Sequence, residues 1–415
     1  MAMQLDRLRS FSYSKWSTLL FGCLLSQCLL SFHLHAAEVN FSGYAKSYNS
    51  WQERIDLPLL QTDASLQSQN SLRLTLEGFG KTAGVDSVWQ LHYEVSPIIS
   101  SVSSNLSDST FSASSGAYRL SDVRSTIGAK TSKRRIQQNL DRFNLQLNFA
   151  AGDLTVGRQA IAFGAARFIN PTDVFLPFDV RTYNTEYRTG IDAIRFQRPF
   201  GQLGEIDFGL ILGPDGKATS SAAFSQVKTN IKGSDVHVTA MRFAEQNLIG
   251  LGLQTALWNF GAWFEAASVS GAQDYWRVSL GLDYAFTEST LAMVEYHYNG
   301  AGTDDVASYL TQTNQIAYTQ GGVFLLGENY IIPAISIQLS PLLSAGLQGV
   351  FNVDDNSTYL SASLNYNVKE DLYIGFGYYH FRGEKLSLTN AGTPLLNSEY
   401  GSNPNNLFVS ISYYF

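Results

Sequence analysis

Apolar residues recur at every second position in segments of about ten residues, and this alternation is the feature that most restricts the fold of the chain. Hydrophobic residues make up 45% of the sequence, yet after residue 37 no apolar run is long enough for a membrane-spanning helix. Strict alternation places apolar side chains on one face of a strand and polar side chains on the other. The pattern therefore predicts an all-β protein whose strands each have one apolar face.

Eighteen alternating segments can be placed along the chain. In a typical one, Leu72, Leu74 and Leu76 alternate with Arg73 and Glu77. Their length suits a tilted transmembrane strand, so we expect an antiparallel, up-and-down transmembrane β-barrel of sixteen to eighteen strands. The expected strands cover residues 39–49, 70–79, 86–97, 138–149, 153–163, 188–199, 204–213, 220–231, 234–244, 247–257, 260–270, 274–286, 290–300, 329–339, 343–352, 357–367, 371–382 and 405–415.

The connections between these segments sort by length. With the N-terminus placed in the periplasm, every predicted periplasmic connection is a short turn, and the long connections all fall on the extracellular side. The long ones cover residues 50–69, 98–137, 164–187, 300–328 and 382–404. Short periplasmic turns and long outer loops are typical of outer-membrane barrels. A soluble β-sandwich or propeller shows the same alternation within single strands, but it does not explain this sorting.

Both ends of the chain point to the outer membrane. Arg7, Arg9 and Lys15 precede an apolar segment over residues 16–34. Small residues follow, so we expect a signal peptide over residues 1–37, cleaved near Ala36/Ala37, and one barrel domain over 38–415. A membrane-spanning helix is the alternative reading of this segment. The last strand ends on Phe415, which resembles the assembly signal of Gram-negative outer-membrane proteins. That resemblance implies recognition by the barrel-assembly machinery.

Composition excludes several other functions. Removing residues 1–37 takes three basic residues and one acidic residue from totals of 28 and 35, which leaves 25 and 34. This acidic balance argues against a nucleic-acid partner. The four histidines of the predicted barrel lie singly on different strands, and none has the spacing of a metal site. No nucleophile elbow or phosphate-binding loop occurs. We therefore expect no enzyme activity, catalytic residue, metal or cofactor.

The interior of an eighteen-stranded barrel is expected to hold water unless loops fill it. By alternation the inward residues include Arg73, Glu94, Arg142, Arg195 and Glu295, a mixed set without a ring of one sign. The connection after residue 163 differs from the Ser-rich connection over 98–117. It contains Asn170-Pro171, Pro177 and several aromatic residues, which make it stiff and amphiphilic. It is expected either to fold into the pore or to pack on the rim.

These considerations select a set of candidates for the lumen or its constriction. The set combines charged residues of the inward strand faces with those of the 164–187 loop. The candidates are Arg73, Glu94, Arg142, Arg158, Arg167, Asp173, Asp179, Arg181, Glu186, Arg188, Asp192, Arg195, Arg277 and Glu295.

Part of this region resembles a known family. Gly157-Arg158-Gln159, Phe163-Gly164, Arg167 and the later Asp192-Ala-Ile-Arg195 are similar to the Gly-Arg-Gln strand and the Asp-x-x-Arg strand of alginate-export-type outer-membrane porins. The resemblance implies an eighteen-stranded barrel with Arg158 and Arg195 facing the lumen. Alternation alone also directs Arg195 inward. It directs Arg158 outward, with Leu154 and Val156, unless a bulge intervenes.

The function predicted from the sequence is an outer-membrane porin for passive or substrate-biased diffusion of small polar solutes. The barrel contacts outer-membrane lipid, and its oligomeric state is left open. A structural sleeve or export conduit for a partner protein or polymer is the alternative. An outer-membrane enzyme whose residues come from separate strands is a further one.

Overall fold

The computed structural model describes residues 35–58, 60–102, 118–121, 125–127, 133–175 and 186–415. Eighteen antiparallel strands form a closed barrel, because the last strand pairs with the first. The predicted fold and strand number are therefore confirmed. The wall strands are β1 (His35–Gln52), β4 (Ser65–Thr82), β5 (Val85–Ser100), β7 (Arg134–Phe149), β8 (Gly152–Gln159), β9 (Ile191–Phe200), β10 (Gly204–Leu212), β11 (Ala222–Ile231), β12 (Ser234–Phe243), β13 (Gln246–Leu257), β14 (Phe260–Gly271), β15 (Tyr275–Thr287), β16 (Thr290–Asn299), β17 (Asn329–Ser340), β18 (Leu343–Asn352), β19 (Thr358–Lys369), β20 (Leu372–Arg382) and β23 (Asn406–Tyr414).

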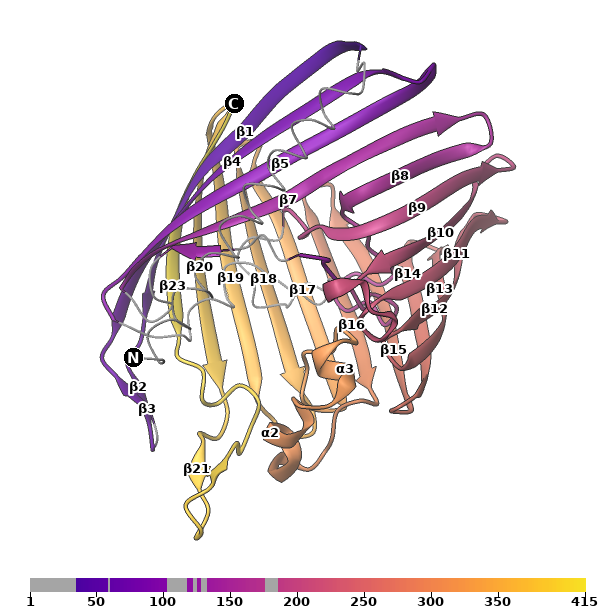
Figure 1. Cartoon of the computed structure of the whole chain (residues 1–415). Helices are drawn as coiled ribbons and strands as arrows, with labels where there is room; N and C mark the ends of the chain where they lie inside the picture. Colours follow the sequence, from indigo (N-terminus) through magenta and orange to yellow (C-terminus); the bar gives the residue numbers. More distant parts are fainter. Residues whose placement is uncertain (1–34, 59, 103–117, 122–124, 128–132, 176–185) are drawn as a thin grey trace, which may run out of the picture.

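Short strands, 3₁₀ turns and short helices lie in the connections between the wall strands. They are β2 (Ile55–Leu57), β3 (Leu60–Thr62), β6 (Ser125–Ile127), the 3₁₀ turns η1 (Pro214–Gly216), η2 (Ala218–Ser220) and η3 (Val306–Ser308), the helices α2 (Tyr309–Gln312) and α3 (Ile316–Thr319), and β21 (Ser387–Leu388) and β22 (Pro394–Leu395). The C-terminus lies at the opposite end of the barrel from α2, α3 and β21 (Figure 1). We call the end with the C-terminus the short-turn end, and the other the long-loop end. The described helices all lack the length and hydropathy that a membrane crossing would need.

The short turns fall where the alternation predicted them. Residues 83–84 join β4 to β5, and residues 232–233 join β11 to β12. Both residues of each pair have positive φ: 52° and 84° at Ala83 and Gly84, and 53° and 85° at Lys232 and Gly233. Two successive positive φ angles define the tight hairpin turn whose twist matches that of the strands. The turns thus fix the register of the long strand pairs.

The outer surface of the barrel is apolar, as expected for a wall that faces lipid. Exposed outward residues include Phe41, Leu74, Leu280, Leu347 and Ile411. The inner surface differs from the expected hydrated lumen. Near the long-loop end it is lined by buried apolar residues of β11 and β12, such as Phe224, Met241 and Phe243, which pack against residues of the long loops. A second apolar cluster joins Tyr330, Tyr359 and Tyr379 to loop residues Ile169 and Leu325. The loops therefore fill part of the barrel.

Strand β8 is shorter than the predicted segment 153–163, and the chain leaves the wall after Gln159. Gly157 has φ of 117°, and a Cβ atom there would lie 2.3 Å from the Phe143 carbonyl oxygen. Strand β7 continues beyond the last residue paired with β8, and β6 pairs with it there instead. On the other side of the gap, the Tyr118 carbonyl accepts the Asp192 N–H at 3.1 Å. The preceding connection thus replaces β8 in the wall.

The hairpin turn at residues 83–84 offers a test of register control. A Cβ atom at Gly84 would meet no heavy atom within 4 Å, so Gly84→Ala changes only the backbone energy at positive φ. We expect this substitution to lower the free energy of unfolding by about 1–2 kcal/mol. The measurement is urea unfolding of the refolded barrel in lipid vesicles, followed by tryptophan fluorescence. Lys81→Ala in the same hairpin removes an exposed ion pair with Asp86 and should change stability by under about 0.5 kcal/mol. Equal losses of stability in the two variants would contradict the role given to the positive φ at Gly84.

Candidate functional site

The first half of the connection between β8 and β9 lies inside the barrel, where two buried carboxylates hold it. Glu265 on β14 accepts the backbone N–H groups of Ala165, Ala166 and Thr172 at 2.5, 3.0 and 2.8 Å. It also accepts the Thr172 hydroxyl at 2.7 Å. The Glu265 side chain has no exposed surface. A buried carboxylate with several N–H donors satisfies its own charge and the donors of a segment outside the sheet.

Glu295 on β16 plays the same role for the next residues. Its carboxylate accepts the N–H groups of Arg167, Phe168 and Ile169 at 3.1, 3.2 and 2.8 Å. It also accepts the indole N–H of Trp263 at 2.7 Å. These contacts place residues 165–172 on the inner faces of β14 and β16. The loop was expected either to fold into the pore or to pack on the rim. Its described first half folds into the barrel.

Strand β15, which lies between β14 and β16, also contacts this segment through two side chains. The Arg277 guanidinium donates to the Pro171 carbonyl at 3.3 Å, and the Ser279 hydroxyl donates to the Ile169 carbonyl at 2.6 Å. Arg277 is only 2% exposed. This predicted lumen residue consequently lies beneath the loop and supports it, and it does not face open lumen.

The second half of the connection returns along the opposite wall. Glu186 forms an ion pair with Lys46 on β1 and accepts the Tyr414 hydroxyl of β23 at 2.8 Å. The next residue, Tyr187, stacks on the Arg73 guanidinium of β4 at 4.1 Å. The Arg188 carbonyl accepts a hydrogen bond from Arg142 on β7 at 2.6 Å. Residues 186–188 therefore lie on the inner faces of β1, β4 and β7.

An ion pair joins the two halves of this loop. Arg188 of the returning half pairs with Asp173 of the first half. Asp173 is fully buried, and burial raises the pKa of its carboxyl while the Arg188 charge opposes that rise. Since the two halves rest on different walls, the Arg188–Asp173 pair marks where the loop spans the bore. We call the described residues 160–175 and 186–190 of this connection the crossing loop.

The wall beneath Tyr187 contains a buried charge network centred on Asp141. Asp141 pairs with Arg73 and with Arg142, the latter at 3.0 Å, and accepts the Gly190 N–H at 2.8 Å. Arg73 also donates to Glu94 at 3.3 Å. Arg73 and Asp141 are each 1% exposed. This network fixes the point where the crossing loop rejoins the wall.

Sequence reasoning missed Asp141, because simple alternation with Phe143 and Leu145 directs it outward. A register shift between His92 and Tyr93 of the facing strand marks a β-bulge, which brings Asp141 to the inner face beside Arg142. An acidic residue next to an inward arginine in an apolar strand was the available clue. Arg119, which donates to the Gly190 carbonyl at 2.8 Å, was also missed. So were Lys46 and the loop-holding role of Glu265.

Arg158 and Asp192 lie at the gap left by β8. Arg158 is 5% exposed and donates to both Asp192 oxygens, at 2.7 and 2.9 Å. It also donates to the carbonyls of Leu140 and Ser121 at 2.9 and 2.8 Å. The register pairs it with outward-facing Phe143, as alternation predicted. All its described contacts are with the barrel wall and with the segment that takes the place of β8 there. The Arg158–Asp192 pair therefore closes the gap in the wall.

The remaining candidates differ in their access to the bore. Arg195 is bound to Asp207 at 2.6 Å in the inner wall. Arg167 is the contrasting case: its side chain is 55% exposed, 3.6 Å from Asp283, and its guanidinium lies 5.7 Å from the Trp263 ring. Two candidates, Asp179 and Arg181, lie outside the described residues. Arg167 therefore differs from the buried arginines in having an exposed side chain.

The described residues contain no group of three or more potential metal ligands. Adjacent aspartates occur in two loops, as Asp304-Asp305 and Asp354-Asp355, and one aspartate of each pair accepts backbone N–H groups. Asp305 accepts the Ala307 N–H at 3.0 Å, and Asp354 accepts the N–H groups of Glu328 and Asn329 at 2.6 and 2.9 Å. The aspartates of these loops accordingly have structural contacts within the protein.

Comparisons with known proteins agree on the architecture. No family model and no curated protein matches the chain. Solved structures do match: OccK9 (OpdG) of Pseudomonas aeruginosa gives a TM-score of 0.59 at 9% identity, covering 92% of this chain and 99% of that one. OccAB4 of Acinetobacter baumannii gives 0.57 at 11% identity, with coverage of 92% and 99%. OccAB1 of the same organism gives 0.57 at 9%, with coverage of 93% and 98%. At these identities the likeness establishes the porin-type barrel fold.

The anchoring of the crossing loop by the buried carboxylates can be tested by substitution of Glu295. Glu295→Ala removes the acceptor for three backbone N–H groups, so we expect the free energy of unfolding to fall on the order of 3 kcal/mol. Release of the segment should also let trypsin cleave after Arg167. The readouts are urea unfolding and mass spectrometry of brief tryptic digests of the folded barrel. Glu370→Ala, at an exposed turn, is the control. Unchanged protection at Arg167 in Glu295→Ala would contradict the anchoring role.

Proposed function

We propose that the chain is an outer-membrane porin that passes small polar solutes by passive or substrate-biased diffusion. One observation carries this proposal: a closed barrel of eighteen strands has a loop anchored across its bore by buried carboxylates and an ion pair. A loop anchored in this way narrows a wide barrel to a selective passage while leaving the wall intact. The similarity in fold to the Occ channels supports the same reading.

The alternatives carry less support. A sleeve for a partner protein would need a wide, unobstructed bore, whereas this one is crossed by a tied loop. We propose no enzymatic activity and no cofactor. The resemblance of Gly157-Arg158-Gln159 to alginate-export-type porins stays a prediction, as does the alternative of an export conduit for a partner protein or polymer. The Arg158 that carries this resemblance is bonded within the wall, which favours a small solute over a polymer that needs a basic passage.

The remaining assignments follow from an outer-membrane location. We propose a signal peptide over residues 1–37 and recognition of Phe415 by the barrel-assembly machinery. Strand β1 begins at His35, close to the proposed cleavage near Ala36/Ala37. The proposed partners are outer-membrane lipid and a small polar solute, without nucleic acid.

Conductance tests the proposed channel directly. Purified protein, refolded in detergent and added to a planar lipid bilayer, is expected to open steady conductance in single steps. Deleting residues 165–184 removes the described residues 165–175, which Glu265 and Glu295 hold, together with the residues that follow up to 184, and should raise the conductance of each step several-fold. A barrel shown to be folded by circular dichroism that conducts nothing would overturn the porin assignment. Unchanged conductance after the deletion would show that the passage lies elsewhere.

Arg167 should influence ion selectivity, because it is an exposed charge on the crossing loop while several other candidate arginines are buried. Arg167→Glu replaces a cation beside Asp283 with an anion, so we expect cations to be favoured more strongly. The measurement is the reversal potential of the channel under a tenfold salt gradient. Arg198→Glu, on the outward face of β9 near the short-turn end, is the matched control and should leave the potential unchanged. Equal shifts for the two variants would remove Arg167 from the passage.

A further inference from the structure

The outward face of β1 departs from the apolar pattern of the wall. Phe41 and Trp51 are outward residues ten positions apart, which corresponds to about 24 Å along the barrel axis for a strand tilted by about 45°. This distance matches the apolar band of about 25 Å that lies between two aromatic girdles in membrane barrels. Within the band, β1 presents only small or polar residues outward: Gly43, Ala45, Ser47 and Asn49.

Strand β4 extends this surface. The register places Asn70 opposite Ser47 and Ser68 opposite Asn49, and we call these four residues the polar patch. The Asn49 amide donates to the Ser47 hydroxyl at 3.1 Å, and the Asn70 amide donates to the Ser68 hydroxyl at 3.3 Å. Among the described residues, these four side chains form no other hydrogen bond. Within the described part of the chain, both amide carbonyls and one N–H of each amide therefore lack a partner.

Apolar residues flank the polar patch on both sides. On β23, Ile411 and Val409 pair with Ser47 and Asn49, and they are 47% and 41% exposed. On β5, Ile99 pairs with Ser68 and is 50% exposed. Hydrocarbon offers no hydrogen-bond partner to amides in such a position. In membranes, small residues that allow close approach and polar residues that hydrogen-bond across a contact mark protein–protein interfaces.

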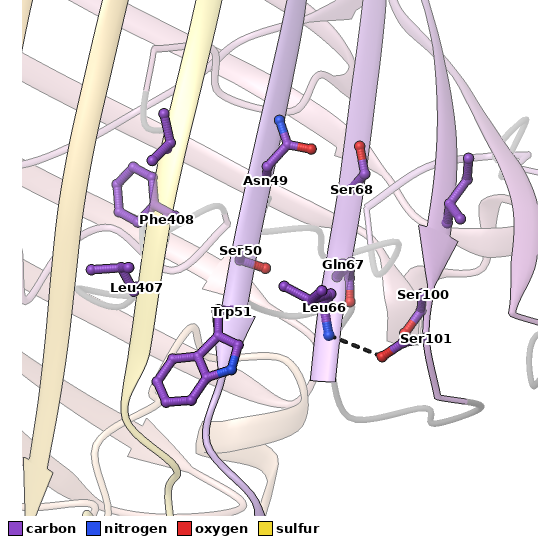
Figure 2. A pocket seen from close by; sticks show the side chains of 12 residues that line it. Asn49, Ser50, Trp51, Leu66, Gln67, Ser68, Ser100, Ser101, Leu407 and Phe408 are labelled. Atoms are coloured by element: carbon purple, nitrogen blue, oxygen red, sulfur yellow. Dashed lines mark hydrogen bonds between the residues drawn. The ribbon is translucent and has the colours of Figure 1, made fainter. Parts of the chain in front are cut away.

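A hollow lies beside the polar patch, toward the long-loop end. It has a volume of about 450 Å³ and lies between the ends of β1, β4, β5 and β23. Its outer walls are formed by Trp51, Leu66, Ile99, Leu407 and Val409. Figure 2 shows Trp51 and Leu66 on neighbouring strands among the residues that line it. The hollow can receive an apolar side chain that projects from a neighbouring surface.

We propose that this face joins two copies of the chain side by side in the membrane. All copies insert in the same direction, so a rotation axis along the membrane normal brings residues of equal depth together. Asparagine and serine each donate and accept hydrogen bonds, and the polar patch is therefore complementary to itself. Ala45 is small and allows the two walls to approach closely beside the polar patch, whereas the Phe415 ring covers Gly43. A lipid chain can fill the hollow but cannot pair with the amides.

This contact goes beyond the proposed channel, because each barrel keeps its own bore. Cysteine cross-linking tests it in the full chain, since residues 38–415 contain no cysteine. Ala45→Cys places a thiol beside the polar patch. Leu251→Cys is the control, on β13, nine strands away around the wall and 46% exposed. After mild oxidation in native outer membranes, we expect Ala45→Cys to give a band of two chains several-fold stronger than Leu251→Cys. The unsubstituted chain is the negative control.

A second variant separates the contact from chance collisions. In the Ala45→Cys background, replacement of both Asn49 and Asn70 by Leu should abolish the two-chain band. Folding is checked by heat-modifiable migration, and the conductance of each barrel should be unchanged. The proposal is overturned if both cysteine variants cross-link equally, or if neither does in folded protein. A cross-link to a chain of another mass, a band that survives the double substitution, or bound lipid on a single barrel would also overturn it.

Discussion

The path of the crossing loop depends on two buried carboxylates, Glu265 and Glu295, which together accept six backbone N–H groups. A chain that leaves a sheet and enters the barrel loses the ladder bonds of its N–H groups, and those groups must find acceptors there. A carboxylate can accept several N–H groups at once. The two residues lie on alternate strands, β14 and β16; Glu265 holds both ends of the segment 165–172, and Glu295 holds its middle. The position of the segment in the bore is therefore fixed by the wall.

The same arrangement decides which charges a solute can meet. Arg277 supports the loop from below, Arg73 lies beneath Tyr187, and Arg188 joins the two halves of the loop. Their charges are neutralised by partners or covered by the loop. Arg167 keeps an exposed side chain beside Asp283. A charge count of the inward faces consequently overstates the charge of the passage, since much of that charge holds the loop in place.

Alternation predicted the strands and turns because a barrel wall imposes period two on every strand, and it correctly directed Arg73, Arg277 and Glu295 inward. It failed where the ladder is irregular. A bulge brings Asp141 to the inner face, and the positive φ at Gly157 precedes the exit of β8 from the wall. Apolar inward residues such as Phe243 were also missed, because their burial depends on loops that are distant in sequence.

The seam between β1 and β23 joins the inner and outer surfaces of the barrel. This pairing closes the sheet and has the largest sequence separation of any strand pair, so chain entropy opposes it most. Inside, Glu186 bridges Lys46 of β1 and Tyr414 of β23, which adds an ion pair and a hydrogen bond across the seam. Outside, β1 carries Ser47 and Asn49 toward the membrane. A neighbouring copy on that face would cover the strand that closes the barrel, so closure of the wall and association of copies would support each other.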